Sequence, residues 1–307
     1  MKVNFICDES GAKGKETVGE QKRGEVGVFA GCFVPDRCLN VFDAWSTTVA
    51  SKYFSQGKVH ISALPKPEQI CLEREVFEFV KVKNMKCAYE AIYPEGFKEG
   101  RGSEIQLYED IENLHPSLKN LYKKYKKPML LHERLFAGMI DKAIAFIHDY
   151  CDSSRDELLV MVDRVDSGIL KIFENSVQET LDMEGVDEPS NAADCREGTS
   201  GKLVGGKEMD IFQTFRNLRG KITIKQIPSE LTIVPDVIAH SLLQHFSEYN
   251  RDCTGSPLHI PEALDAHELK HFFYGQADLL GGMNWWTDAQ YMHPEQKRDD
   301  DDAPERH

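Results

Sequence analysis

Apolar runs of strand length alternate with amphipathic helical patterns along much of this chain. The run 157–166, ELLVMVDRVD, is followed directly by 168–183, in which apolar residues recur at helical spacing. A strand, a turn and a helix in that order are typical of an α/β layer, in which helices cover a central sheet. The sequence therefore predicts an α/β fold.

The other strands and helices are predicted from the same two patterns, apolar runs of strand length and apolar residues at helical spacing. A polar, Gly-rich hairpin loop is expected between the first two strands, and a polar stretch with helical character precedes residue 128. Further strands are predicted at 3–8, 26–35, 85–94 and 221–228, and further helices from Asp36 to 54 and at 68–82, 128–151, 236–250 and 262–274.

The domain organisation follows from where this pattern stops. Residues 184–207 are rich in Gly and poor in apolar residues, which predicts a mobile insertion or exposed loop. We expect one core domain over 1–253 that contains this insertion. Residues 254–307 then form a C-terminal accessory segment with an acidic tail.

Bulk properties restrict the class of protein. Of the 307 residues, 41% are hydrophobic, which is enough for a packed core. No apolar run reaches membrane-spanning length, and the N-terminus lacks the features of a secretory signal, so no membrane association or export is expected. The eight cysteines include no CxxC pair. We therefore expect a reduced, cytoplasmic protein.

The net charge of −14 bears on nucleic-acid binding. Sequence-independent coating of DNA draws its affinity from Lys and Arg, so the whole surface is unsuited to it. A local basic patch, or a metal ion that offsets the acids, would still permit contact with a phosphate backbone.

Three aspartates occupy comparable places relative to predicted strands. Asp8 ends the first strand, Asp163 ends the strand 157–166, and Asp236 opens the helix after the last strand. Ligands of α/β proteins bind outside strand ends, where residues from distant positions converge. Carboxylates that converge repel one another unless a cation lies between them, and Mg²⁺ or Mn²⁺ prefers such oxygen ligands. Each aspartate taken alone also suits a turn or, for Asp236, a helix N-cap.

Four segments together resemble a known family. FICDESG at 5–11, KVHISAL at 58–64, LLVMVDRVD at 158–166 and IVPDVIAHSLL at 233–243 occur in the order seen in a prokaryotic and phage family, domain of unknown function 3800. That family is similar to the RNase H-like superfamily, and the resemblance spans roughly residues 3 to 247. It implies an RNase H-like mixed sheet flanked by helices, with helical insertions and a C-terminal extension.

The resemblance also implies a function and a site. It implies a divalent-metal-dependent nuclease or phosphodiesterase that acts on RNA or DNA, with Mg²⁺ or Mn²⁺ held by Asp8, Asp163 and Asp236. Glu9 and His60 would lie nearby, Glu9 as a supporting acid and His60 as a group that orients water. Glu9 adjoins Asp8 in an extended segment, so its side chain is expected on the opposite face.

Two departures from the family pattern motivate an alternative. Val59 replaces the acid that usually precedes the histidine, and TIVPD replaces a lead-in that contains Gln. These changes favour a catalytically inactive RNase H-like module that binds nucleic acid or a protein partner in a defence or mobile-element system.

Two basic segments are candidates for nucleic-acid contact. Residues 117–134 interleave lysines with tyrosines, which suits phosphate binding and base stacking, although a solvated basic helix end has the same composition. A second basic segment covers 215–225. The candidate contacts are Lys123, Lys124, Lys126, Lys127, Arg216 and Arg219.

A third hypothesis is a zinc-dependent peptidase. HELKH at 267–271 matches the H-E-x-x-H pattern, in which two histidines on one helix face bind zinc and the glutamate is the base. His267 and His271 would be ligands, Glu268 the base, and His259 the third ligand. The pattern also arises by chance in helices, and it lies outside the segments that carry the family resemblance.

Overall fold

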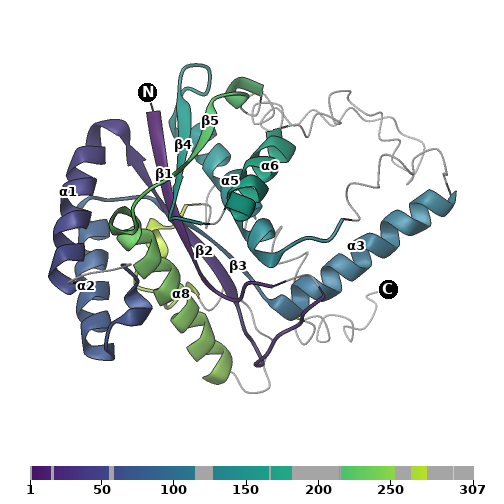
Figure 1. Cartoon of the computed structure of the whole chain (residues 1–307), viewed down its shortest axis with the longest axis horizontal. Helices are drawn as coiled ribbons and strands as arrows, with labels where there is room; N and C mark the ends of the chain where they lie inside the picture. The colour runs from purple at the N-terminus through teal and green to yellow at the C-terminus, as the bar shows by residue number, and fades with distance from the viewer. Residues whose placement is uncertain are drawn as a thin grey trace, which may run out of the picture.

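The computed structural model describes residues 2–14, 17–54, 59–114, 127–165, 167–181, 214, 216–252, 264–274 and 293. They form an α/β fold with one five-stranded mixed sheet between two layers of helices (Figure 1). The strands are β1 (Lys2–Gly11), β2 (Gly27–Pro35), β3 (Cys87–Ile92), β4 (Glu157–Val162) and β5 (Ile222–Gln226). The helices are α1 (Asp36–Tyr53), α2 (Lys66–Val82), α3 (Pro94–Leu114), α5 (Leu131–Tyr150), α6 (Ser167–Leu181) and α8 (Ile233–Asp252), with short 3₁₀ helices η1 (Ile61–Ala63), η4 (Ser229–Thr232) and η5 (Lys270–Phe272).

The strands are ordered β3-β2-β1-β4-β5 across the sheet. The first three form an antiparallel meander, whereas β4 and β5 run parallel to β1. The parallel ladder between β1 and β4 ends at the pair Cys7 and Val162, while β1 continues to pair with β2 as far as Gly11. Asp8 therefore lies inside β1 rather than at its end, but it is the first residue beyond the ladder with β4.

Two hydrophobic cores lie on opposite faces of the sheet. Helices α1, α2 and α8 pack on one face, where Ile6 and Ala30 share a hydrophobic cluster with apolar side chains of α8 such as Ile238. Helices α5 and α6 pack on the other, where Phe5 and Phe29 meet them. Side chains of a strand point alternately to the two faces, which is why β1 is apolar on both sides and buried throughout its centre.

One predicted element is wrong. The helix expected over 262–274 is not formed in its described part, 264–274, which consists of turns and the 3₁₀ helix η5. None of the described helices combines the length and apolar character required to cross a bilayer. The six described cysteines, Cys7, Cys32, Cys38, Cys71, Cys87 and Cys151, form no disulfide bonds. The insertion predicted at 184–207 lies outside the described residues.

Gly31 in β2 packs closely against the Phe5 side chain of β1. A Cβ atom there would lie 2.5 Å from Cζ of Phe5, whose buried ring stacks on Phe33. Gly31→Ala is therefore expected to lower the free energy of unfolding by about 1–3 kcal/mol, because the Phe5 ring must leave its position. Gly102→Ala is the control, since a Cβ atom at this exposed position of α3 meets nothing within 4 Å. Chemical denaturation of both variants checks this, and equal loss in the two would contradict it.

Candidate functional site

The three predicted aspartates come together at the end of the β1–β4 ladder. Asp8 follows the last ladder pair on β1, Asp163 follows the last residue of β4, and Asp236 lies in the first turn of α8. All three are buried, with 8%, 7% and 2% of their surfaces exposed. The acidic side chains of Asp236 and Asp163 both act electrostatically on Asp8. Segments far apart in the chain thus bring three carboxylates to one place.

Each carboxylate is fixed by a backbone N–H group through one of its two oxygens. Asp8 Oδ1 accepts from the amide of Glu9 at 2.9 Å, and Asp163 Oδ1 accepts from the amide of Arg164 at 2.6 Å. Asp236 Oδ2 accepts from the amide of Ile61, at the start of η1, at 2.8 Å. Backbone amides thus fix the orientation of each carboxylate.

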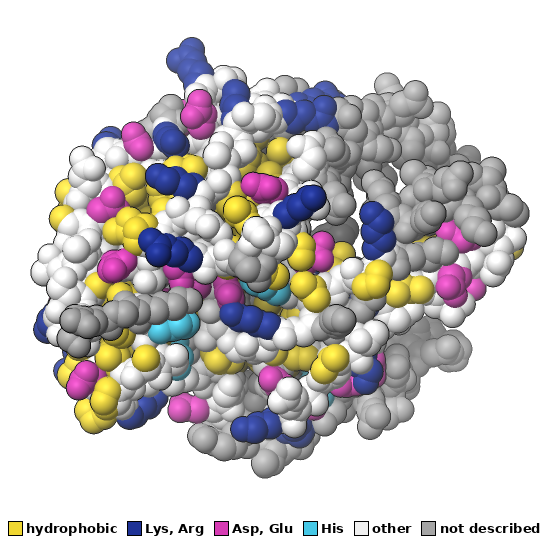
Figure 2. All heavy atoms as spheres, viewed as in Figure 1, with side chains coloured by type: hydrophobic (Ala, Val, Ile, Leu, Met, Phe, Trp, Pro, Cys, Tyr) yellow, Lys and Arg dark blue, Asp and Glu magenta, His cyan; other side chains and the backbone are white. Residues whose placement is uncertain are grey.

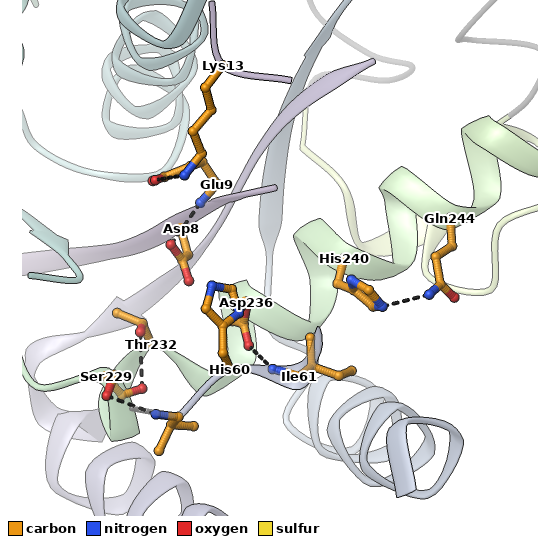
Figure 3. A network of polar contacts seen from close by, with 11 residues as sticks. Asp8, Glu9, Lys13, His60, Ile61, Ser229, Thr232, Asp236, His240 and Gln244 are labelled. Carbon is orange, nitrogen blue, oxygen red and sulfur yellow. Dashed lines mark hydrogen bonds and ion pairs between the residues drawn. The ribbon is translucent and has the colours of Figure 1, made fainter. Parts of the chain in front are cut away.

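Asp236 is not a helix N-cap, because α8 begins three residues earlier, at Ile233. Its carboxylate instead holds the segment before α2: Oδ2 binds the Ile61 amide, and Oδ1 lies 2.8 Å from His60 Nδ1. His60, which the family resemblance implied to lie near the acids, contacts Asp236, and its side chain is 38% exposed. In Figure 3 the carboxylate of Asp8 is directed toward His60 and Asp236.

Burial and like charge act on Asp8 in the same direction. Burial raises the pKa of the Asp8 carboxyl well above its ordinary value, and the charges of Asp236, Glu9 and Asp163 raise it further, while the Glu9 amide opposes them. A carboxylate in this position is costly to ionise unless positive charge is brought to it. That is the electrostatic condition under which a bound cation stabilises a protein.

The donor set suits a divalent cation but does not form a closed cage. Carboxylate oxygens are the ligands that Mg²⁺ and Mn²⁺ prefer, and the charges that act most strongly on Asp8 come from other carboxylates. Among the described residues, no group of three or more His, Cys, Asp or Glu side chains is arranged so that it could hold a metal ion. Mg²⁺ usually takes only one or two carboxylates and completes its shell with water and substrate phosphate, so an open site of this kind fits it.

Glu9 points away from the other acids, to the α5 face of the sheet (Figure 3). Its carboxylate lies 2.6 Å from the ammonium of Lys13 and 3.6 Å from Nε2 of His132. Burial alone would raise the pKa of Glu9, but hydrogen bonding and charge from His132 and Lys13 outweigh it and lower the pKa to about 2. Glu9 acts on Asp8 through its backbone amide and its charge and is not placed as a ligand beside it.

His240 also belongs to the site, although it was not among the site residues predicted from the sequence. It lies one helical turn after Asp236 on the same face of α8, and Asp236 and His60 both act on it electrostatically. Burial lowers its pKa, as do the charges of Lys66 and His60, whereas Asp236 raises it. The spacing of Asp and His by four residues in a predicted helix was a signal that could have found it.

Among the predicted basic contacts that the structure describes, Arg216 and Arg219 are not brought to the acids. Arg216 and Arg219 precede β5, which runs parallel to β4, so they lie at the end where β4 begins and Asp163 lies at the other end. Arg219 donates to the carbonyl of Leu181 there. Lys127 is exposed beside the start of α5, and Lys123, Lys124 and Lys126 lie outside the described residues.

The HELKH segment does not have the geometry of a zinc pair. His267 and His271 do not share a helix, because this segment consists of turns and η5. His267 is buried, with Nε2 3.3 Å from Ser241 Oγ and Nδ1 accepting from the amide of Leu269 at 3.1 Å. Glu268 is exposed and pairs with Lys81. His259, the expected third ligand, lies outside the described residues.

His267 is instead a buried neutral histidine that should make the protein sensitive to acid. Burial, and then the charge of His245, lower its pKa to about 3, whereas an unfolded histidine titrates near pH ~6.5. Between these values only the unfolded chain binds the proton, so the stability contributed by this group is present above about pH 6.5 and is lost as the pH falls.

The expected loss from His267 is about 2 kcal/mol between about pH 6.5 and pH 5. His267→Gln keeps a polar side chain beside Ser241 but does not titrate, so its stability should fall less over this range. Urea denaturation of the two proteins across pH measures the difference, and parallel pH profiles would show that His267 does not contribute.

Comparison of the chain with family models, curated proteins and solved structures finds no match.

Proposed function

We propose that the protein is a divalent-metal-dependent nuclease or phosphodiesterase with an RNase H-like fold. The observation that carries the proposal is the convergence of Asp8, Asp163 and Asp236, each with one oxygen held by a backbone amide. The strand order, with an antiparallel meander joined to two parallel strands, and the family resemblance of the segments that supply the acids also support it.

Different residues of the site would bind the metal, position the carboxylates and orient water. Asp8 and Asp236, with Asp163 beside them, would hold Mg²⁺ or Mn²⁺, which would neutralise the phosphodiester and activate a water molecule. The amides of Glu9, Arg164 and Ile61 keep the carboxylates in place, so that little reorganisation is needed when a cation binds. His60 is half-exposed beside Asp236 and can orient water at the edge of the site.

The experiment is a cleavage assay on labelled RNA, DNA and RNA–DNA hybrid, with Mg²⁺, with Mn²⁺ and with a chelator. The wild type is expected to cleave at least one substrate only when a divalent ion is present. Asp163→Asn and Asp236→Asn are expected to lower the rate by about 10²-fold or more, because each removes a charged ligand. Equal activity of the wild type and both variants, or cleavage that the chelator does not reduce, would exclude the proposal.

Binding without cleavage would have a different meaning. If the wild type binds these nucleic acids but leaves them intact under all metal conditions, the catalytically inactive binding module is the better description. Isothermal titration with Mn²⁺ separates the two further, since loss of Mn²⁺ binding in Asp236→Asn is expected only for a metal site built on these acids.

A further inference from the structure

A row of polar side chains leads away from the acid cluster along α8. Asp236, His240 and Gln244 follow one another at intervals of four residues and so lie on one face of the helix. Figure 3 shows His240 and Gln244 on the side of Asp236 away from Asp8. A strand of substrate that leaves the acid cluster in this direction meets these two side chains next.

Lys66, the first residue of α2, completes the row. Its ammonium donates to Gln244 Oε1 at 2.7 Å, and Gln244 Nε2 lies 2.6 Å from His240 Nε2. Because Gln244 accepts from Lys66 through its oxygen, its amide nitrogen is the donor toward His240. The neutral His240 ring therefore accepts at Nε2 and carries its proton on Nδ1.

This arrangement leaves hydrogen-bond donors near the acids. Lys66 is exposed and uses one of its three N–H groups on Gln244, so two remain for a ligand. His240 is half-buried, and none of the described residues is recorded as an acceptor for its Nδ1–H group. A positive charge and a ring N–H group, fixed relative to each other by Gln244, suit a phosphate oxygen.

Charge also favours an anion here. A polyanionic substrate is repelled by Asp8, Asp163 and Asp236 and needs a cation on its approach. Figure 2 shows Lys and Arg side chains around the face on which acidic and histidine side chains are exposed together. The charges of Lys66 and of Asp236 both act on the His240 ring.

We propose that Lys66 and His240, joined by Gln244, bind a backbone phosphate of the substrate strand next to the acid cluster. The inference rests on the proposed function for the identity of the substrate as a nucleic acid. It assigns a substrate-binding role to residues outside the carboxylate set, and it gives the direction in which the strand leaves the cluster, along α8.

The test measures binding and cleavage separately. Fluorescence anisotropy follows short labelled single-stranded RNA and DNA in Ca²⁺ at several salt concentrations, and the cleavage assay is run in Mg²⁺ or Mn²⁺. Lys66→Met is expected to weaken binding about five- to tenfold. It should also reduce the magnitude of the slope of log affinity against log salt concentration by about 1, since one phosphate contact is lost. His240→Ala is expected to weaken binding by a smaller factor, and both variants should raise KM more than they lower kcat.

The control is Lys83→Met, an exposed lysine at the other end of the same helix α2. It should bind and cleave like the wild type, and thermal unfolding should show that all three variants are folded. If the wild type cleaves and the Lys66 and His240 variants match Lys83→Met, the phosphate site is wrong and the proposed function stands. If the wild type binds without cleaving and both variants bind weakly, the phosphate site stands and the nuclease is wrong. Absence of both binding and cleavage in the wild type overturns both.

Discussion

Asp8→Asn is expected to reduce cleavage by about 10²-fold or more and, in metal-free buffer, to make the protein more stable than the wild type by on the order of 1–2 kcal/mol. The loss of activity would follow from the removal of a proposed metal ligand. The gain in stability follows from the raised pKa of Asp8, because burial and the charges of Asp236, Glu9 and Asp163 make its ionised form costly.

The pH dependence of this gain has a defined sign. A carboxyl group whose pKa is raised on folding destabilises the native state when it is ionised, that is, at neutral pH. As the pH falls through the raised pKa toward the ordinary value near ~3.9, Asp8 takes up its proton and the cost disappears. The difference in unfolding free energy between Asp8→Asn and the wild type should therefore be largest at neutral pH and should shrink on acidification.

Metal ions should reverse the order of stability. A cation that binds only the folded protein stabilises it in proportion to its concentration relative to the dissociation constant, so Mg²⁺ or Mn²⁺ should raise the unfolding temperature of the wild type more than that of the variant. Thermal unfolding with and without the metal measures both effects. Asp36→Asn, at an exposed position in the first turn of α1, is the matched control and should change neither property much. An Asp8→Asn protein that is less stable than the wild type at neutral pH would contradict the electrostatic account.

Lys142→Met is expected to have the largest effect on stability, a loss of about 3–5 kcal/mol. Lys142 on α5 pairs with Glu90 on β3 at 2.7 Å, both side chains are almost completely buried, and the ammonium also donates to the carbonyl of Tyr89. Its removal leaves the Glu90 carboxylate buried without its partner, next to Asp141, whose pKa burial already raises to about 6.

The double variant Lys142→Met/Glu90→Gln separates the loss of the pair from the cost of a stranded charge. It should recover a substantial part of the stability, since neither buried charge remains. Urea denaturation measures the free energy of unfolding of both variants, and the dependence of this free energy on urea concentration is compared between them. A single variant within 1 kcal/mol of the wild type, or a double variant no better than the single, would mean that the carboxylate is readily neutralised or hydrated after Lys142 is removed.

Most strands and helices could be predicted from the sequence, because each depends on the spacing of apolar residues within one segment. The strands around Ile6 and Val160 and the helices α1, α2, α5, α6 and α8 were all predicted, with ends displaced by a few residues. The helix expected at 262–274 is not formed because contacts of His267 and Phe273 with other elements, and not helical hydrogen bonding, determine the conformation there.

The site was only partly predictable for a related reason. Asp8, Asp163 and Asp236 could be selected by their place relative to strands, and the alternation along β1 correctly put Glu9 on the other face. The direction of β5 relative to β4 is set by pairing between distant segments, so the end of the sheet at which Arg216 and Arg219 lie could not be inferred. The partners of His60 and His240 depend on how η1 and α8 meet, which no single segment encodes.

The alternation along β1 also means that the site depends on strand register. Asp8 faces the acid cluster and Glu9 faces His132 because β1 pairs with β2 and β4 in one alignment. A shift of one residue would exchange the two faces, placing Glu9 among the acids and Asp8 against α5, and would turn every apolar side chain of β1 toward the wrong core. A slip of this kind would therefore remove the acid cluster and the stability of the fold at the same time.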